Sequence, residues 1–447
     1  MLNQITVLAD PATDLNKSDR LKSLISEVQT DYTLIYFQDR TVRWKENALA
    51  RMLRIARDSD AGMLYADHFK IKEGQAVPNP LADYQQGSIR DDFDFGPVVL
   101  CKTDLIRQAV SRIPDSLRYS ALYALRLSVS LSCLPFRIPE YLYFSMETDA
   151  RKSGEKQFDY VDPRNREVQL EREQVCSDYL KEIGAYLSPE FAQLQEITDS
   201  FPVKASVIIP VKNRERTIAD AIRSALKQKT AFDYNILVVD NYSTDRTTEI
   251  IQGLQQEYPK LIRILPELPD RGIGGCWNLA ANHPLCGKYA VQLDSDDLYS
   301  DEYTLAKIVD AFEKEKAAMV IGSYRMVNFN LEEIPPGIID HKEWTWDNGR
   351  NNALRINGLG APRAFYTPIL RKNPFPDVSY GEDYAACLAI SRAYRIARIY
   401  EPLYLCRRWD DNSDADLPAE KVNAHNRYKD FIRTNEILAR INKNRTV

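Results

Sequence analysis

An acidic segment follows a short apolar run in the second half of the chain. Asp294-Ser-Asp-Asp297 places three carboxylates directly after Tyr289-Ala-Val-Gln-Leu293, which has the composition of a buried strand. Like charges at this spacing repel each other unless a cation neutralises them. A hard divalent cation with oxygen ligands, Mg²⁺ or Mn²⁺, is the natural partner. The segment therefore predicts a divalent metal site at the end of a strand.

Two further acidic positions have the types and settings for chemistry. Glu382 and Asp383 follow Gly381, and a carboxylate near a hydroxyl group can remove its proton as a new bond forms. The helix dipole alone also favours acids at a helix start. Asp240 ends the apolar run Asn235-Ile-Leu-Val-Val-Asp240, where a carboxylate can accept hydrogen bonds from a nucleotide base or can cap the following turn.

The elements around these acids alternate between short apolar runs and segments of helical periodicity. The pattern predicts strands at residues 205–210, 235–240, 261–265 and 289–293, and helices at 216–228, 247–258 and 276–282. Such alternation is typical of a mostly parallel sheet with helices on both faces. Ligands of such sheets bind at the carboxyl ends of the strands, where the polar clusters beginning at Val211, Asn241 and Asp294 lie.

Residues from about 204 to 413 resemble a family 2 glycosyltransferase with the GT-A fold. Four segments carry the resemblance, in the order and at the spacing usual for the family: Ser206-Val-Ile-Ile-Pro-Val-Lys-Asn213, Val238-Val-Asp-Asn-Tyr-Ser-Thr-Asp245, Leu293-Asp-Ser-Asp-Asp297 (the DxD motif) and Gly381-Glu-Asp383 (the ED motif). The resemblance implies an α/β fold with a Rossmann-like mixed sheet. It also implies metal-dependent, inverting transfer of a sugar from a nucleotide-sugar donor.

The resemblance also assigns roles to residues. Asp296 would ligate the metal, Asp383 would act as the catalytic base, and Glu382 would orient the acceptor or begin the helix that follows. The residues expected to contact the donor are Pro210, Val211, Asn213, Asp240, Arg271, Asn278, Asp294 and Ser295. Within this set Asp240 would bind the base. Asp294 or Ser295 would lie nearer the ribose. The glycines between Arg271 and Asn278 do not directly follow a strand, so we reject a dinucleotide-binding interpretation.

One motif departs from the family pattern. Many members carry a histidine that joins the metal, and Trp409 stands at about this place in Cys406-Arg-Arg-Trp-Asp-Asp-Asn-Ser413. Metal binding assisted by histidine is therefore in doubt. Arg407 or Arg408 would hold the diphosphate instead, and Asp410 or Asp411 would reach the metal. Charged surface residues are the alternative interpretation.

The first half of the chain resembles the same plan without its acids. Arg137-Ile-Pro-Glu-Tyr-Leu-Tyr143 is similar to Arg398-Ile-Tyr-Glu-Pro-Leu-Tyr404, which indicates an internal duplication. Gln38-Asp-Arg40 and Ser120-Ala-Leu122 stand where the DxD and ED motifs would recur. We therefore expect a degenerate, noncatalytic GT-A-like domain at 1–165, a helical connector at 166–203 and the catalytic GT-A domain at 204–447. Asp91-Asp-Phe-Asp94 is a rival acidic cluster that we do not expect to bind metal.

Composition limits the partners. The 447 residues include 59 Lys and Arg against 64 Asp and Glu, a net charge of -5 that argues against nucleic-acid binding. No apolar run approaches the roughly 20 residues needed to cross a bilayer, and the first ten residues do not resemble a signal peptide. Seven scattered cysteines without a CxxC motif indicate reduced thiols. These features predict a cytoplasmic protein with at most a peripheral membrane contact.

Together the sequence predicts a glycosyltransferase that uses a UDP- or GDP-sugar and a glycan or lipid-linked glycan acceptor. A sugar nucleotidyltransferase is a rival class, but the segment Val211-Lys-Asn-Arg-Glu215 lacks the glycine-rich loop which that chemistry uses. A noncatalytic scaffold that binds glycans or nucleotide sugars is the second alternative. The acids at Asp294–Asp297 and Glu382–Asp383 argue against it.

Overall fold

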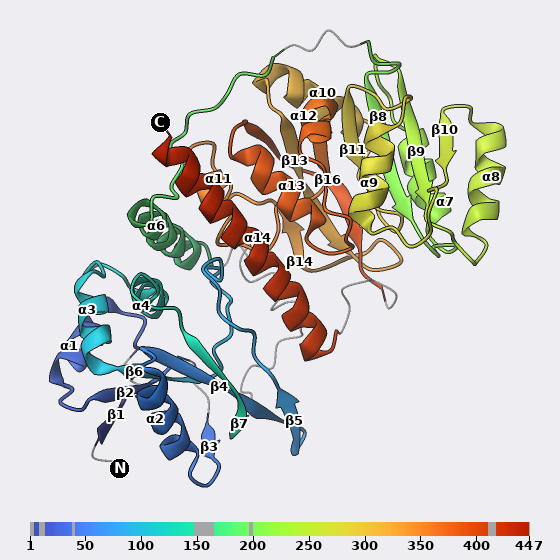
Figure 1. The fold of residues 1–447 in the computed structure, drawn as a ribbon. Coiled ribbons are helices and arrows are strands. Elements are labelled where there is room, and N and C mark those ends of the chain that lie inside the picture. The colour runs from blue at the N-terminus through green and yellow to red at the C-terminus, as the bar shows by residue number, and fades with distance from the viewer. Residues whose placement is uncertain are drawn as a thin grey trace. The chain divides into compact units, whose positions relative to one another are not determined.

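The structure is a computed structural model that describes residues 4–8, 14–37, 41–146, 165–195, 200–409 and 417–446. The chain forms two compact units, each built on one mixed sheet (Figure 1). Unit 1 comprises Met1–Tyr186, Leu354–Ile356 and Asp416–Val447, and unit 2 comprises Leu187–Ala353 and Asn357–Ala415. The predictions made for Gln38-Asp-Arg40 and for Asp410 and Asp411 lie outside the described residues.

Unit 2 contains a nine-stranded sheet in the order β10-β9-β8-β11-β15-β13-β16-β12, with β14 paired to β13. Its strands are β8 (Ala205–Val211), β9 (Tyr234–Asp240), β10 (Leu261–Ile264), β11 (Tyr289–Gln292), β12 (Leu298–Tyr299), β13 (Met319–Val327), β14 (Glu333–Ile339), β15 (Arg363–Tyr366) and β16 (Ile396–Arg407). The first four strands of the order are parallel, and β15 then runs antiparallel to both of its neighbours. The sheet is therefore mixed, and its parallel part coincides with the strands predicted from the sequence.

The helices of unit 2 follow its strands. They are α7 (Ile218–Leu226), α8 (Thr247–Glu257), α9 (Ile273–Asn282), α10 (Thr304–Glu315), α11 (Gly349–Asn352), α12 (Thr367–Lys372) and α13 (Glu382–Ser391). In α7 the buried residues Ile218, Ala221, Ile222 and Ala225 recur at helical spacing, so this face packs on the sheet. Strand β9 is buried along its whole length, as expected for a strand covered on both faces.

Unit 1 contains a seven-stranded sheet in the order β1-β2-β6-β4-β7-β3, with β5 paired to β4. Its strands are β1 (Ile5–Leu8), β2 (Tyr32–Tyr36), β3 (Val42–Trp44), β4 (Met63–Lys72), β5 (Gln75–Asn79), β6 (Val98–Lys102) and β7 (Phe136–Met146). Its helices are α1 (Ser18–Glu27), α2 (Ala48–Ser59), α3 (Thr103–Ser111), α4 (Ala121–Ser130), α6 (Arg166–Glu182) and α14 (Ala419–Arg445). Met52, Leu64 and Leu100 belong to its apolar core and are fully buried.

The two sheets share their strand order and the direction of every corresponding strand pair. Strands β1-β2-β6-β4-β7-β3 correspond to β8-β11-β15-β13-β16-β12, and β5 corresponds to β14. Arg137 lies opposite Tyr65 as Arg398 lies opposite Ile321, so the similar segments found in the sequence hold the same register. Strand β1 corresponds to β8 and not to β9, because β1 runs parallel beside β2 as β8 does beside β11. The strands without a counterpart among the described residues of unit 1 are β9 and β10.

The division into units differs from the predicted ranges at two helices. Helix α6, expected in a connector, and α14, expected in the catalytic range, both belong to unit 1. Buried charges explain α14: Asp430 accepts hydrogen bonds from Ser88 Oγ at 2.8 Å and from Arg90 Nε at 3.2 Å. Hydrogen-bonded ion pairs of this kind have no periodic pattern in the sequence. The same contacts show that the C-terminal helix is packed against its unit.

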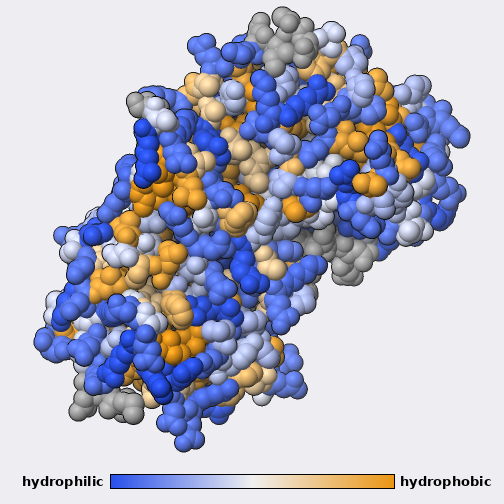
Figure 2. All heavy atoms as spheres, viewed as in Figure 1, coloured by the Kyte–Doolittle hydropathy of each residue, from blue (hydrophilic) through white to orange (hydrophobic). Residues whose placement is uncertain are grey.

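Hydrophilic residues cover much of the face of the molecule shown in Figure 2, with hydrophobic residues in patches between them. Within the described part of the chain, no helix has both the length and the apolar character needed to span a bilayer. Within the described ranges the seven cysteines form no disulfide with one another.

Candidate active site

The acidic segment lies at the end of β11, at the point where the chain leaves the sheet. Asp294 accepts hydrogen bonds from Gln292 Nε2 at 2.9 and 3.0 Å, and its backbone N–H donates to the Tyr404 hydroxyl at 2.9 Å. Asp297 is buried and accepts a hydrogen bond from the backbone N–H of Arg407 at 2.7 Å. Ser295 is also buried. Asp297 is thus buried at this strand end, whereas Asp294 and Asp296 are partly exposed.

The electrostatics of this segment favour a bound cation. Burial raises the pKa of Asp294, and the charge of Asp296 raises it further. Burial, then Asp296 and Asp294, raise the pKa of Asp297 well above its usual range. A divalent cation would offset this cost, so the carboxylates fit the expected metal. Within the described ranges, however, no group of three His, Cys, Asp or Glu side chains is already arranged as a metal site.

The ED motif reaches the same region from α13. Gly381, at φ 80°, ends the preceding loop, and Glu382 and Asp383 open the first turn of the helix. Asp383 Oδ2 lies 3.0 Å from Arg363 Nη1, and Glu382 is buried. Burial lowers the pKa of Arg363, but the charges of Asp383 and Asp294 more than compensate and raise it. Arg363 is therefore held between the two acidic motifs.

Gln292 completes this connection. Its side-chain carbonyl accepts the backbone N–H of Arg363 at 3.0 Å, while its amide nitrogen donates to Asp294. The two acidic motifs, about ninety residues apart in the sequence, are thereby joined through β11 and β15. The sequence reasoning missed both residues. Arg363 begins a strand that has no motif of its own, and only its pairing with β11 gives it a role.

Trp409 lies beside Asp296, at the place where the family pattern has histidine. Its indole Nε1 donates to Asp296 Oδ2 at 3.3 Å, and Arg214 Nε lies 3.7 Å from the same oxygen. The Arg216 guanidinium lies 5.0 Å from the Trp409 ring centre and 4.6 Å from that of Phe329. An indole N–H cannot ligate a metal, so Trp409 orients Asp296 by a hydrogen bond.

A basic cluster lies beside Asp296 and Trp409. It consists of Arg214, Arg216 and Arg407, and Arg407 also lies over the Phe329 ring and 3.4 Å from Asp220. Arg407 was predicted, whereas Arg214 and Arg216 were not, although the run Lys212-Asn-Arg-Glu-Arg216 carries a visible charge signal. Guanidinium groups are well suited to phosphate oxygens, because their N–H groups form a planar fork.

Asp240 ends β9 and is fully buried. Its carboxylate accepts hydrogen bonds from Thr248 Oγ1 at 2.6 Å and Arg263 Nε at 2.9 Å, and from the Ser243 backbone N–H at 3.2 Å. Burial raises the pKa of Asp240, but the hydrogen bonds to Thr248, Arg263 and Ser243 outweigh it and lower the pKa. The turn role considered from the sequence is present, and the base-binding role stays a prediction.

The neighbouring donor residues tie β8 and β9 together. The Val211 carbonyl accepts the Asn241 N–H at 2.8 Å. Asn213 is in the left-handed region at φ 54°, and its side-chain oxygen accepts the Thr244 N–H at 2.7 Å. Pro210 precedes them on β8 and is partly exposed. The structure thus brings Pro210, Val211 and Asn213 next to the turn that follows Asp240.

Arg271 and Asn278 are both engaged by the segment before α13. Arg271 pairs with Asp377 at 3.0 Å. Asn278 donates to the Phe375 carbonyl at 2.8 Å and accepts the Phe375 N–H at 3.0 Å. These contacts hold α9 against that segment, so the structure gives both residues a positioning role. Their contact with a donor stays a prediction.

Comparison with known proteins identifies this part of the chain. The profile described as Glycosyl transferase family 2 matches residues 206–376, which include the β8 segment, the Asp240 turn and the DxD motif. This segment is a family 2 glycosyltransferase domain. The resemblance to family 2 and the mixed α/β sheet expected from the sequence are thereby confirmed for these residues.

Several curated proteins are similar to part of this chain. Chondroitin synthase of Pasteurella multocida is 30% identical over 44% of this chain and 22% of its own length. The poly(ribitol-phosphate) beta-glucosyltransferase of Bacillus spizizenii is 26% identical over 49% of this chain and 35% of its own length. The chain thus spans about a fifth and about a third of these relatives. The solved structure of S. aureus TarS 1-349 in complex with UDP-GlcNAc is 23% identical over 53% of this chain and 72% of its own, with a TM-score of 0.41.

Proposed function

We propose that unit 2 transfers a sugar from a UDP- or GDP-sugar to a hydroxyl group of a glycan or lipid-linked glycan, with inversion and with a divalent cation. The carrying observation is the chain of contacts from Asp294 through Gln292 and Arg363 to Asp383. It supports a single site in which the Asp294–Asp297 segment would face the donor and Asp383 would face the acceptor. In a direct displacement the acceptor hydroxyl attacks the sugar from the face opposite the leaving group. The donor-side and acceptor-side carboxylates must therefore be held at fixed positions relative to each other.

On the donor side, the base would bind near Asp240 and Asn213. The diphosphate would lie toward Arg214, Arg216 and Arg407, which lie around Asp296 and Trp409. Asp296 would hold Mg²⁺ or Mn²⁺, which supplies charge stabilisation for the departing diphosphate when bound, and Asp294 or Ser295 would lie nearer the ribose. Guanidinium groups add to that stabilisation, since they are fixed before the reaction begins.

On the acceptor side, Asp383 would remove the proton from the attacking hydroxyl group. It lies at the first turn of α13, and Arg363 orients its carboxylate from 3.0 Å away. Positioned general bases contribute roughly 10²–10⁴ to a rate. Glu382 is buried beside it and helps to fix the start of the helix.

The relatives support a polymeric acceptor. Two of them carry names that refer to a chondroitin polymer and to poly(ribitol-phosphate). A role in polysaccharide synthesis follows for this chain as part of the proposal. We propose further that unit 1 is a noncatalytic GT-A-like domain, supported by its strand order and by Leu122 at the position of Asp383. The proposal places the protein in the cytoplasm with at most a peripheral membrane contact.

The test is donor hydrolysis and binding with a panel of UDP-, GDP-, CMP- and dTDP-sugars and Mn²⁺, with and without EDTA. We expect slow release of one nucleotide that depends on the metal. Asp383→Asn should keep donor binding and lose turnover. If the wild-type chain binds a nucleotide sugar but never turns it over with any acceptor glycan, the noncatalytic scaffold replaces the transferase.

A further inference from the structure

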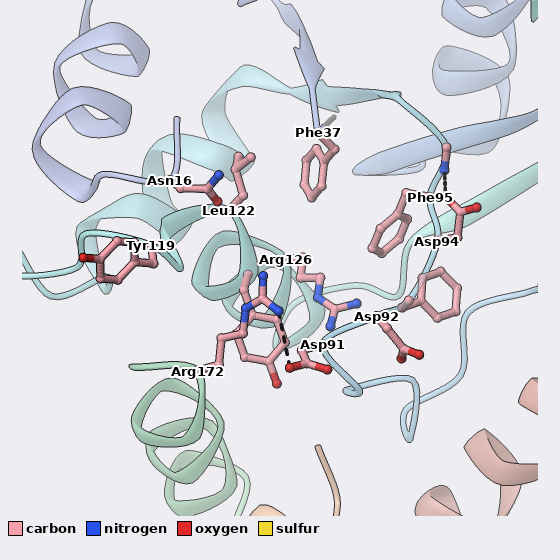
Figure 3. A pocket seen from close by; sticks show the side chains of 13 residues that line it. Asn16, Phe37, Asp91, Asp92, Asp94, Phe95, Tyr119, Leu122, Arg126 and Arg172 are labelled. Carbon is pink, nitrogen blue, oxygen red and sulfur yellow. Dashed lines mark hydrogen bonds and ion pairs between the residues drawn. The ribbon is translucent and has the colours of Figure 1, made fainter. Parts of the chain in front are cut away.

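Unit 1 contains a cavity of about 410 Å³, a size within the roughly 300–1,000 Å³ of small-ligand sites. It is lined from β2, from the segment before β6, from the beginning of α4 and from α6 (Figure 3). Phe37, Phe95 and Leu122 form apolar walls, and Arg126 and Arg172 reach its middle. Nothing in the function proposed for unit 2 uses this cavity.

The cavity occupies the place in unit 1 that the active site occupies in unit 2. Tyr32 pairs with the last residue of β6, and Tyr289 pairs with the last residue of β15. The two strand pairs therefore have the same register. Phe37 lies five residues after Tyr32, as Asp294 lies five residues after Tyr289. Phe37 therefore stands at the position of the first DxD carboxylate.

The second catalytic position corresponds in the same way. Arg137 and Arg398 hold equivalent registers in β7 and β16. Leu122 lies fifteen residues before Arg137, as Asp383 lies fifteen residues before Arg398. The next residue is tyrosine in both helices, and both hydroxyls donate to a backbone carbonyl: Tyr123 to Ile89 at 2.7 Å and Tyr384 to Ala353 at 2.5 Å. The local framework is thus kept while the acids are replaced.

The parts of unit 2 expected to bind the base have no counterpart here. Strands β9 and β10, with the turn after Asp240, are without equivalents in the described sheet of unit 1. Unit 1 corresponds to the part of unit 2 that carries the DxD and ED motifs. In unit 2 this is the part where the donor sugar and the acceptor would meet. This difference favours a carbohydrate over a nucleotide as the ligand class. Aromatic rings suit that class, since their faces pack against the C–H surfaces of sugars, and Tyr119 at the rim is 37% exposed.

Arg126 indicates the charge of the ligand. It is only 3% exposed, it lies over the Tyr123 ring at 4.7 Å, and its Nη1 has no hydrogen-bond partner among the described residues. A buried donor without a partner is costly, and an acceptor on a ligand would satisfy it.

The acids of the cavity are engaged elsewhere. Asp91 pairs with Arg355 and lies 3.4 Å from Arg172, and Asp92 accepts a hydrogen bond from Arg90 at 2.6 Å. The charge of Arg126 acts on Asp92, but among the described residues no carboxylate forms an ion pair with Arg126. The cation is therefore available to an anion from outside the chain.

We propose that this cavity binds an anionic carbohydrate, with sugar rings against the aromatic walls and a carboxylate or phosphodiester oxygen at Arg126. That this carbohydrate is a segment of the acceptor glycan rests on the function proposed for unit 2. A noncatalytic site of this kind would retain the growing polymer between successive transfers.

The test is calorimetric titration of the full-length chain with UDP and Mg²⁺ present to occupy unit 2. The probes are a hyaluronan hexasaccharide, which carries carboxylates, a ribitol-phosphate oligomer, which carries phosphodiesters, and neutral chitohexaose. Arg126→Gln should weaken binding of the anionic probe at least tenfold, and Tyr119→Ala at the exposed rim should weaken it as well. Arg54→Gln, on the exposed face of α2, is the matched control and should bind as the wild type does.

The outcomes are distinct. Binding of either anionic probe with this dependence supports the proposal, and the probe that binds identifies the anion. The proposal is overturned if neither anionic probe binds, if chitohexaose binds equally well, or if Tyr119→Ala and a folded Arg126→Gln variant both bind normally. Donor hydrolysis by unit 2 is measured in parallel and should be unchanged in both variants. If the wild-type chain binds the glycan probe but does not hydrolyse any donor, the transferase proposal is wrong. The assignment of the cavity as a carbohydrate site would then remain.

Discussion

The Arg363 guanidinium lies 3.0 Å from the Asp383 carboxylate, at the meeting point of the two acidic motifs. The charge of Arg363 also acts on Asp294, and the backbone N–H of Arg363 donates a hydrogen bond to the side chain of Gln292. This partly buried cation therefore links the expected base to the expected metal-binding segment. It contacts Asp383 directly and acts on the reaction through it, so we regard Arg363 as a positioning residue.

Substitution of Arg363 tests this relation. Arg363→Gln should lower kcat about 10²-fold with little change in the KM for the donor, because the carboxylate loses its orientation. Arg363→Lys should recover part of the loss, since it restores the charge without the planar fork. Steady-state kinetics against donor and acceptor, with circular dichroism as a control for folding, provide the readout. Equal loss in both variants, or a change confined to KM, would contradict the positioning role.

Asp383→Asn should reduce glycosyl transfer roughly 10²–10⁴-fold and leave the donor Kd within about twofold. The amide keeps the size of the carboxylate but cannot accept the proton of the acceptor. Product formation and nucleotide binding are measured on the same preparations. Asp310→Asn, an exposed carboxylate on α10, is the matched control and should behave as the wild type does. Retained transfer in Asp383→Asn would remove Asp383 from the reaction.

Asp296→Asn should raise the half-saturating Mn²⁺ concentration by about tenfold or more. The expected ligand loses its charge, while the hydrogen bond from Trp409 can persist to the amide oxygen. Metal titration of donor hydrolysis, with EDTA-treated protein as the starting point, gives the value. An unchanged Mn²⁺ dependence would show that Asp296 is not the ligand.

Trp409 permits a test of the departure from the family pattern. Trp409→Phe keeps the ring next to Phe329, 5.4 Å away, and removes the donor to Asp296. Trp409→His instead offers an imidazole nitrogen, which is a good ligand for Mn²⁺. We expect the half-saturating Mn²⁺ concentration to be several-fold lower in Trp409→His than in Trp409→Phe. Identical metal dependence in the two variants would mean that position 409 does not reach the metal.

Asp240 should contribute to stability in a pH-dependent way. Its pKa in the folded protein is lowered by Thr248, Arg263 and Ser243, against the opposing effect of burial. Its contribution is therefore fully present above the unfolded pKa of about 3.9 and is lost as the pH falls through the lower folded value. Asp240→Asn should lower the free energy of unfolding by about 2–4 kcal/mol at pH 7, because Arg263 is left unpaired.

Urea unfolding of both proteins between pH 7 and pH 3 checks this expectation. The difference between wild type and Asp240→Asn should be constant at neutral pH and should shrink below about pH 4. A difference that grows on acidification would mean that Asp240 is not held ionised by its neighbours.

The sequence by itself determined the elements and the segments that carry chemistry. Strands β8, β9, β10 and β11 and helices α7, α8 and α9 lie where apolar runs and helical periodicity place them. Local patterning suffices there, because a buried parallel strand is apolar throughout and a packed helix is apolar on one face. The acidic segment after β11 and the acids at the start of α13 were visible for the same reason: they follow local signals.

Tertiary structure decided which of these residues meet. Arg363 has no local motif, and only the antiparallel pairing of β15 with β11 puts it between Asp294 and Asp383. The membership of α14 in unit 1 rests on buried ion pairs such as Arg90 with Asp430 at 3.2 Å, which have no sequence period. The cavity at Phe37 and Leu122 became recognisable only once strand register aligned these residues with Asp294 and Asp383. Residue types and local order are read from the chain, whereas pairing between distant segments depends on contacts that the chain makes only when folded.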